Sequence, residues 1–338
     1  MQMQTQHTFI DLFAGIGGFR LGMTKNNFKC VFSSEIDKNA CENYELNFGE
    51  NPYCDITNKD EKDIPDFNVL CAGFPCQSFS KAGRREGFDD ETRGTLFFHI
   101  LRILKHKKPK AFILENVPNL EIHNNGHTFD TIKNSLLDLG YHISYKVLDA
   151  SDFGVPQSRK RIIIVGTLDR PFDFSKLKKT EIYATIPFLD DFQIKIDFSK
   201  NNTIQKSFLD KSLYTIIDNS VRQKSKLHFI GYLNGKNIRR GKSIDKLDKT
   251  STHRQTNRIY DASGIMPTIC SSEKGGRYWV HYQDNVRKLS IDECYRFMGF
   301  PMSFKKKGNL GDMYKRVGNS ICVNMVDEIA KELKRHLG

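Results

Sequence analysis

The segment Asp11-Leu12-Phe13-Ala14-Gly15-Ile16-Gly17-Gly18 decides the fold of this chain. It follows an apolar stretch that predicts a β-strand over residues 8–13, and a helical pattern follows over residues 17–25. Glycines between a strand and a helix allow a tight turn and a close approach of the backbone to a ligand. The Gly-Lys-Ser/Thr of a phosphate-binding loop is missing, and Arg20 occupies the third glycine position of a dinucleotide fingerprint. The turn therefore predicts a nucleotide-like cofactor without a pyrophosphate.

The same alternation of strand and helix continues to about residue 167. Strands are predicted at residues 8–13, 29–34, 68–72, 111–115, 143–148 and 161–167, and helices at 17–25, 38–48, 95–105 and 128–139. Short apolar strands that alternate with helical patterns are typical of βαβ units around a parallel sheet. We therefore expect an α/β fold with a doubly wound, mostly parallel sheet.

The pattern changes after Pro171, where the strands become short and Lys and Arg more frequent. Helical patterns return over residues 290–299 and 319–337, and the last one is amphipathic, so we expect it to pack back on the first domain. The predicted organisation has four parts: a first domain over residues 1–187, a smaller irregular domain over 188–290, a hinge over 291–318, and a returning C-terminal helix over 319–338.

The charge, the cysteines and the apolar runs of the sequence indicate what kind of partner and which compartment to expect. Lys and Arg number 52 against 40 Asp and Glu, which favours a polyanionic partner, although a merely basic surface is the alternative. The eight cysteines form neither a CxxC pair nor a Cys/His cluster, so we expect no metal site and no disulfide scaffold. No apolar run approaches the roughly 18 to 20 residues of a membrane span. We expect a cytoplasmic protein in a reducing compartment.

Two acidic positions extend the cofactor prediction. Glu35 lies at the end of the second strand, 20 residues beyond Gly15, where an acidic side chain can accept both hydroxyls of a ribose. Asp55-Ile56 can cap an adenine through a carboxylate and an apolar contact. The alternative is an ordinary glycine turn with an unrelated acidic residue. The pattern favours an adenosine-type ligand.

A cysteine on a stiff turn is the first candidate for chemistry. The run Gly73-Phe74-Pro75-Cys76-Gln77-Ser78-Phe79-Ser80 follows an apolar strand, and the proline fixes its own φ and restricts the residue before it. The sulfur direction is thus set before a substrate binds. Taken alone, Cys76 is more simply explained as a small buried side chain.

Two further motifs converge on the same predicted sheet edge. Leu114-Glu115-Asn116-Val117 ends one strand and Gln157-Ser158-Arg159-Lys160-Arg161 begins another. Side chains alternate along an extended segment, so Gln157, Arg159 and Arg161 are predicted to share one face. A thiolate, a carboxylic acid and cations are what carbon alkylation of a pyrimidine requires, because the ring needs a nucleophile, a proton on nitrogen and a held carbonyl.

Together these motifs resemble those of DNA cytosine-5 methyltransferases of the bacterial restriction-modification type, over essentially the whole chain. The matching motifs are Phe13-Ala14-Gly15-Ile16-Gly17, Glu35, Asp55-Ile56, Gly73-Phe74-Pro75-Cys76-Gln77, Glu115-Asn116-Val117, Gln157-Ser158-Arg159-Lys160-Arg161, Arg287-Lys288-Leu289 to Gly299-Phe300-Pro301, and Gly318-Asn319-Ser320. The resemblance implies the cofactor S-adenosyl-L-methionine, with S-adenosyl-L-homocysteine as product. It implies these cofactor contacts: Phe13, Ala14, Gly15, Gly17, Glu35, Ile36, Asp55, Ile56, Pro75, Leu96, Asn319 and Ser320.

The resemblance also implies the chemistry. Cys76 would add to C6 of a cytosine flipped out of duplex DNA, Glu115 would engage N3, Arg161 would engage O2, and Arg159 would support the site. Residues 188–290 would be the target-recognition domain. The expected DNA contacts are Gln77, Ser80, Arg84, Arg85, Arg93, Gln255, Arg258 and Thr268, with Arg258 the first choice for a base contact.

Three alternatives remain at this point. A tRNA cytosine-5 methyltransferase shares the fold and the catalytic residues, but the long basic segment suits a reader of duplex DNA better. A DNA-binding regulator without catalysis is disfavoured by the complete set of chemical residues, and an NAD-dependent dehydrogenase by Arg20 and the Pro-Cys pair. The expected partners are double-stranded DNA and a restriction endonuclease that acts on the same site without direct contact, and the expected state is a monomer.

Overall fold

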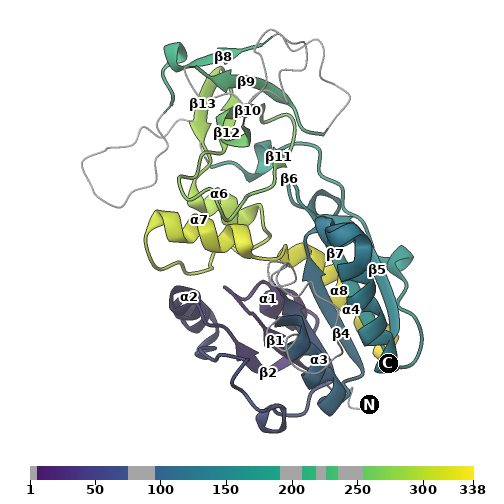
Figure 1. Cartoon of the computed structure of the whole chain (residues 1–338). Coiled ribbons are helices and arrows are strands. Elements are labelled where there is room, and N and C mark those ends of the chain that lie inside the picture. The colour runs from purple at the N-terminus through teal and green to yellow at the C-terminus, as the bar shows by residue number, and fades with distance from the viewer. Residues whose placement is uncertain (1–5, 75–95, 191–207, 218–225, 235–253) are drawn as a thin grey trace, which may run out of the picture.

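The computed structural model describes residues 6–74, 96–190, 208–217, 226–234 and 254–338. Figure 1 shows two parts: a larger α/β part below, which holds both ends of the chain, and a smaller part above, built on a second sheet. Helices α6 (Ile291–Arg296) and α7 (Leu310–Asn319) lie between them.

A six-stranded sheet organises the larger part. Its strands are β1 (Thr8–Leu12), β2 (Lys29–Ser34), β3 (Val69–Gly73), β4 (Ala111–Asn116), β5 (His142–Asp149) and β7 (Lys160–Thr167), in the order β2-β1-β3-β4-β7-β5. The pairs from β2 to β4 are parallel, and β7 runs antiparallel to both of its neighbours. The doubly wound, mostly parallel sheet is confirmed, with β7 as its one reversed strand.

Helices cover both faces of this sheet, so the central strands β3, β4 and β7 are mostly apolar and buried, whereas the edge strands β2 and β5 are more polar and partly exposed. In β3, Val69 and Cys71 point to the face covered by α1 (Gly18–Thr24) and α8 (Val323–Leu337). Leu70 and Ala72 point to the opposite face, covered by α3 (Leu96–Lys107) and α4 (His127–Asp138). Because side chains alternate in direction along a strand, successive residues of β3 belong to two different hydrophobic cores.

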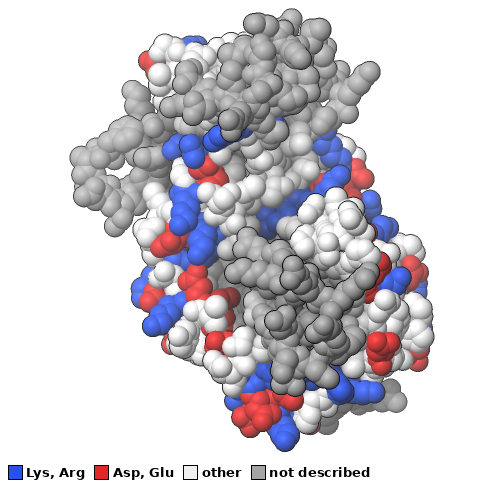
Figure 2. Space-filling view, in the orientation of Figure 1, with Lys and Arg blue, Asp and Glu red and all other residues white. Residues whose placement is uncertain are grey.

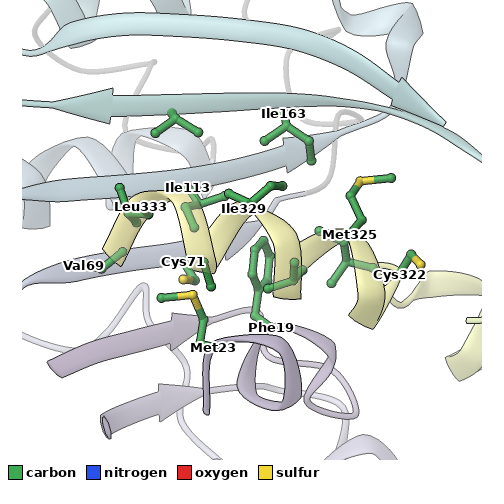
Figure 3. Packing of buried hydrophobic residues seen from close by; sticks show 14 of the residues in the cluster. Phe19, Met23, Val69, Cys71, Ile113, Ile163, Cys322, Met325, Ile329 and Leu333 are labelled. Atoms are coloured by element: carbon green, nitrogen blue, oxygen red, sulfur yellow. The ribbon is translucent and has the colours of Figure 1, made fainter. Parts of the chain in front are cut away.

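The last helix returns to the first domain, as predicted. Figure 3 shows α8 lying across the sheet, with Met325 and Ile329 close to Phe19 of α1. The two helices approach closely because a Cβ on Gly22 would lie only 2.5 Å from the Val326 Cβ atom. Small residues at such a contact let two helix backbones come together.

The upper part is more regular than the irregular domain that we expected. Strands β8 (Tyr214–Ile216), β9 (Phe229–Leu233), β10 (Arg258–Asp261), β12 (Trp279–Tyr282) and β13 (Asn285–Lys288) form one sheet in the order β13-β12-β10-β9-β8. A two-stranded ladder of β6 (Gln157–Ser158) and β11 (Met266–Pro267) connects it to the larger part. The strands are short and several pairs are distant in sequence, so no local turn signal identified the pairing.

The sequence predicted one of the two helices α2 (Lys38–Phe48) and α7 and missed the other. Helix α2 was predicted with its observed bounds, whereas α7 was not predicted, because Gly311 and Gly318 interrupt its pattern. Asn319, expected to begin the last helix, ends α7 instead. Short 3₁₀ turns occur at Glu61–Asp63, Pro118–Leu120, His123–Gly126, Ala150–Asp152, Phe174–Lys176, Ile186–Phe188, Lys211–Leu213 and Gln255–Asn257.

Within the described ranges, no helix is both long enough and apolar enough to span a bilayer.

Candidate active site

The predicted site residues gather at the edge where the parallel strands end. Strands β1 to β4 all have their carboxyl ends there, which is where ligands bind in open α/β sheets. Strand β7 is reversed, so its first residues reach the same edge: Asn116, the last residue of β4, pairs with Ile162. A parallel β7 would have placed Arg161 at the opposite edge. The reversal therefore brings Arg161 beside Glu115.

Glu115 and Arg161 form the chemical centre of this edge. The Arg161 Nε atom donates to Glu115 Oε1 at 2.8 Å, and the two side chains are 14% and 13% exposed. Burial raises the pKa of Glu115 above its ordinary value, while Arg161 and, more remotely, Arg159 lower it. The result is a carboxyl group that takes up a proton more readily than a solvated one and is held by a cation.

Two neighbours fix the chain where it leaves β3 toward the cysteine. The Asn116 Nδ2 atom donates to the Phe74 carbonyl oxygen at 2.9 Å. Gly73 leaves room for the acid, because a Cβ there would lie 3.3 Å from Glu115 Oε2. The chain thus passes Glu115 immediately before Pro75 and Cys76. Those two residues and the predicted DNA contacts Gln77, Ser80, Arg84, Arg85 and Arg93 lie outside the described part of the structure.

Arg159 does not contact Glu115. It is 1% exposed, and its guanidinium donates to three backbone carbonyls, those of Ile269 at 2.9 Å and of Gly318 and Ser320 at 2.8 Å each. Burial, and to a lesser extent Arg161, lowers the pKa of Arg159 to about 9, so that it still carries its charge at neutral pH. Arg159 therefore joins the start of β7 to the upper part and to the segment before α8.

Gln157 has a similar joining role. Its Nε2 atom donates to the Phe297 carbonyl oxygen at 2.9 Å, and its Oε1 atom accepts from the Ile269 amide at 2.8 Å. The side chains of Gln157, Arg159 and Arg161 were expected to face the cysteine together, but they have different partners. Arg161 serves the chemical centre, and the two side chains before it connect the two parts of the molecule.

The glycine turn and Glu35 form one hydrogen-bonded unit. The Gly15 amide donates to Glu35 Oε2, and the amides of Ile36 and Asp37 donate to Glu35 Oε1, each at 2.8 Å. Gly15 and Gly17 have φ values of +55° and +86°, which glycine adopts without strain. The Glu35 carboxylate is thereby fixed at the edge of the turn, with acceptor sites left for the hydroxyls of a ribose.

Apolar side chains flank this carboxylate. Ile36 is 64% exposed, Phe13 is half-buried with φ +55°, and Ile56 is buried. The Asp55 carboxylate accepts from the Thr57 amide at 2.9 Å and from its hydroxyl at 2.7 Å, and these bonds lower the pKa of Asp55. An exposed isoleucine beside fixed carboxylates suits an adenosine, which has a flat apolar face and polar edges.

The remaining predicted cofactor residues lie around the turn. Ala14 is buried, Leu96 begins α3 and is half-buried, and Asn319 is exposed at the end of α7. Ser320 is packed against the turn, because a Cβ on Gly18 would lie 2.6 Å from the Ser320 Oγ atom. The segment between α7 and α8 therefore lies against the glycine turn.

Asp11 was not predicted as a site residue, although it lies just before the glycine turn. It is fully buried, and neither carboxylate oxygen has a hydrogen-bond partner of normal geometry among the described residues; the same is true of the Ser34 hydroxyl. Burial raises the pKa of Asp11 well above its ordinary value. The charge and the backbone amide of Arg20 offset part of this effect. The sequence feature that could have singled out Asp11 is its position as the one acidic residue within an apolar strand.

Two of the three predicted DNA contacts of the upper part, Gln255 and Thr268, are joined by a hydrogen bond. The Gln255 Nε2 atom donates to the Thr268 carbonyl oxygen, and the Thr268 hydroxyl donates to the Ser158 carbonyl oxygen, both at 2.7 Å. Arg258 begins β10 and is half-buried. Figure 2 shows Lys and Arg side chains gathered across the middle of the molecule, between its upper and lower parts. A basic band suits a polyanion.

A cavity of about 490 Å³ lies elsewhere, beside His7 and Phe28 and the end of α8. It is next to the amino end of β1, away from the edge that collects the site residues. Among the described residues, no group of three or more His, Cys, Asp or Glu side chains is placed to hold a metal ion. The candidate site is therefore the carboxyl edge.

The fold and this edge define a class, an α/β protein whose sheet edge carries a glycine turn with a fixed carboxylate and a half-buried acid–cation pair. The family model for "C-5 cytosine-specific DNA methylase" matches residues 7–335. The chain is 38% identical to Type II methyltransferase M.HhaI of Haemophilus parahaemolyticus over 95% of this chain and 92% of that protein. It is 41% identical to Type II methyltransferase M.HaeII of Haemophilus aegyptius over 96% and 92%.

The solved structure of the S. pombe Dnmt2 methyltransferase superposes with a TM-score of 0.69 at 20% identity, over 98% of this chain and 99% of that one. At that identity the likeness shows the fold alone. The chain belongs to the C-5 cytosine-specific DNA methylase family. It is a DNA cytosine-5 methyltransferase that uses S-adenosylmethionine.

Proposed function

We propose that this enzyme methylates cytosine within one specific DNA sequence, as the modification half of a restriction-modification system. The Glu115–Arg161 pair carries the proposal, because it places a proton-binding acid and a cation beside the segment that leads to Cys76. The relatives described as Type II methyltransferases support the assignment to such a system.

The acid and the cation act on the two polar atoms of the pyrimidine that carry charge during addition. Glu115, with its raised pKa, holds a proton at N3, and Arg161 donates to O2. Both interactions draw electrons from the ring and make C6 electrophilic. The Cys76 thiolate then forms a bond to C6, and C5 becomes nucleophilic.

When bound, S-adenosylmethionine supplies an electrophilic methyl group to that carbon. The residues that would hold it are Phe13, Ala14, Gly15, Gly17, Glu35, Ile36, Asp55, Ile56, Pro75, Leu96, Asn319 and Ser320. After C5 has gained the methyl group it loses its proton to a base, and the electrons return to expel Cys76 from C6. The step balances: cytosine exchanges one hydrogen for one methyl group, the methyl donor leaves as S-adenosyl-L-homocysteine, the N3 proton returns to Glu115, the C5 proton leaves on the base, and the enzyme recovers its thiolate.

The upper part is proposed to read the DNA. A stacked cytosine cannot reach Glu115 and Arg161 at the sheet edge, so the base must be flipped, at a cost of a few kcal/mol that contacts to DNA offset. The half-buried Arg258 on β10 is our first choice for a guanine contact. The hydroxyl of Thr268 already donates to Ser158, so a phosphate at that position would have to exchange with this bond.

Three finer features are proposed with the same function. The enzyme is a cytoplasmic monomer, and eight cysteines without a CxxC pair or a Cys/His cluster fit a reducing compartment. A nuclease that cuts the same sequence acts on DNA independently of it. Arg159 is a positioning residue, since its three bonds to carbonyls connect the reacting edge to the upper part.

Bisulfite sequencing of DNA incubated with the protein and S-adenosylmethionine tests the proposal. We expect protected cytosines in one recurrent sequence context on duplex DNA and none on tRNA. Methylation without a recurrent context, or methylation of tRNA alone, would contradict the site-specific function.

A further inference from the structure

Two asparagines of α2 grip the loop that joins α6 to α7. The Asn43 Nδ2 atom donates to the Lys307 carbonyl oxygen and its Oδ1 atom accepts from the Lys307 amide, both at 2.9 Å. Asn47 makes the same pair of bonds to Lys305, both at 2.8 Å. Each side-chain amide thus pairs with a backbone as a neighbouring strand would.

The spacing explains why two asparagines suffice. Residues four apart lie on one face of a helix, separated by about 6 Å along its axis. Two residues of extended backbone span roughly 6.6 Å, so Lys305 and Lys307 repeat at almost the same interval. The asparagine pair and the loop backbone therefore match in length, and both pairs of bonds form without distortion.

The gripped loop is packed together with α6 and, through α6, with the upper sheet; we call these elements the block that carries the upper sheet. Phe300 and Phe304 stack edge-on at 4.8 Å between ring centres, and Phe300 also contacts Tyr295 of α6 at 5.3 Å. Helix α6 is itself joined to β13 by the fully buried Arg287–Glu293 ion pair, at 2.7 Å. Because these contacts are closely packed, a shift of the loop is expected to shift the upper sheet with it.

The helix that grips the loop begins at the cofactor turn. Asp37 caps α2, its amide donates to the Glu35 carboxylate at 2.8 Å, and its own carboxylate pairs with Lys315 of α7 at 3.5 Å. Figure 1 shows α2 directly below α7 and its loop. One helix therefore connects the predicted ribose site with the block that carries the DNA-reading sheet.

We propose that Asn43 and Asn47 are positioning residues for methyl transfer. They set the distance and angle between the upper sheet and the cofactor side of the cleft, so that DNA held by the sheet presents its base to Glu115 and Arg161. The inference rests on the proposed DNA-reading function of the upper part. Among the described residues, the side chains of Asn43 and Asn47 bond to backbone groups of α2 and of the loop and not to Glu115 or Arg161, so their loss is expected to act through alignment.

The test compares Asn43→Ala, Asn47→Ala and the double variant with Asn39→Ala, an exposed asparagine one turn earlier on α2. Steady-state methylation of duplex DNA gives KM and kcat, and calorimetry gives the Kd for S-adenosylmethionine without DNA. We expect the double variant to raise the KM for DNA on the order of tenfold, with the cofactor Kd within about twofold of the wild-type value. Asn39→Ala should match the wild type in every measurement.

A graded variant separates alignment from folding. Asn47→Asp keeps the acceptor for the Lys305 amide and loses the donor, so its KM for DNA should lie between those of the wild type and Asn47→Ala. Because Asn47 is half-exposed, both variants remain testable if the double variant does not fold. A KM for DNA equal to that of the wild type in the Asn47 variants, or an equal loss of cofactor and DNA affinity, would overturn the inference. A wild-type protein inactive on duplex DNA would instead refute the proposed function.

Discussion

Replacing Glu115 by Gln removes the group that can take up and release a proton at the chemical centre, and it leaves the shape of the side chain unchanged. The amide oxygen still accepts from Arg161 Nε, which lies 2.8 Å from the carboxylate. A charge-assisted hydrogen bond is about twice as strong as a neutral one, so the loss there is about 1 kcal/mol. The neutral side chain also avoids the cost of burying a carboxylate, which offsets part of that loss. We expect the free energy of unfolding to change by no more than about 1 kcal/mol.

The catalytic effect should be far larger than the effect on stability. A general acid contributes roughly 10²- to 10⁴-fold to a rate, which corresponds to about 3 to 5 kcal/mol in the barrier. The assay is single-turnover transfer of a labelled methyl group to saturating duplex DNA, with the affinities for DNA and cofactor measured in parallel. The rate of transfer should fall by that factor while both affinities stay within about threefold of the wild-type values.

The pH dependence gives a second check on the same prediction. Burial raises the pKa of Glu115, and the protonated form is the active one, so the wild-type rate should fall as the pH rises through that raised pKa. Glu115→Gln has no such proton and should lack this limb. A Gln variant that transfers at the wild-type rate, or that keeps the same limb, would refute the assignment of Glu115 as the acid.

Three further predictions concern the framework of the site. Burial raises the pKa of Asp11, so the folded state binds that proton more tightly than the unfolded state does. The wild type should therefore lose stability as the pH rises from the unfolded pKa through the folded one, and Asp11→Asn should flatten this slope in thermal melts. Arg159→Met leaves three buried carbonyls unpaired and should lower the free energy of unfolding by about 3 to 5 kcal/mol, measured by urea titration. Gly22→Ala should cost about 1 to 3 kcal/mol in the same titration, because the new methyl group meets Val326 at 2.5 Å, and the added Val326→Ala change should restore part of it; an unchanged midpoint would refute the close α1–α8 contact.

The sequence predicted the larger part well because its signals are local. Each strand of the sheet is a short apolar run bounded by turns, and the glycine turn identifies the cofactor edge without tertiary information. The direction of β7 could not be predicted from its own residues. Its apolar run has the same pattern in either direction, and only the need to bring Arg161 to Glu115 distinguishes them.

The features that the sequence missed depend on contacts between distant segments. Helix α7 buries residues such as Tyr314 and Val317, but its two glycines weaken the helical pattern in the sequence. The upper sheet pairs strands that lie far apart in the sequence. The grip of Asn43 on Lys307 joins residues 264 positions apart, so no spacing rule indicates it. For Arg159 the motif gave the residue, and only the structure shows the three carbonyls that it binds.

The central claim is that Cys76 bonds to cytosine C6 beside Glu115 and Arg161. Duplex DNA with 5-fluorocytosine at the target position tests it directly, since fluorine at C5 cannot leave as a proton does and the cysteine then cannot be expelled. In the presence of S-adenosylmethionine we predict a covalent protein–DNA complex that survives denaturation, with the DNA attached to the peptide that contains Cys76. Attachment at another residue, or methylation of ordinary DNA by a protein that never forms this complex, would contradict the account.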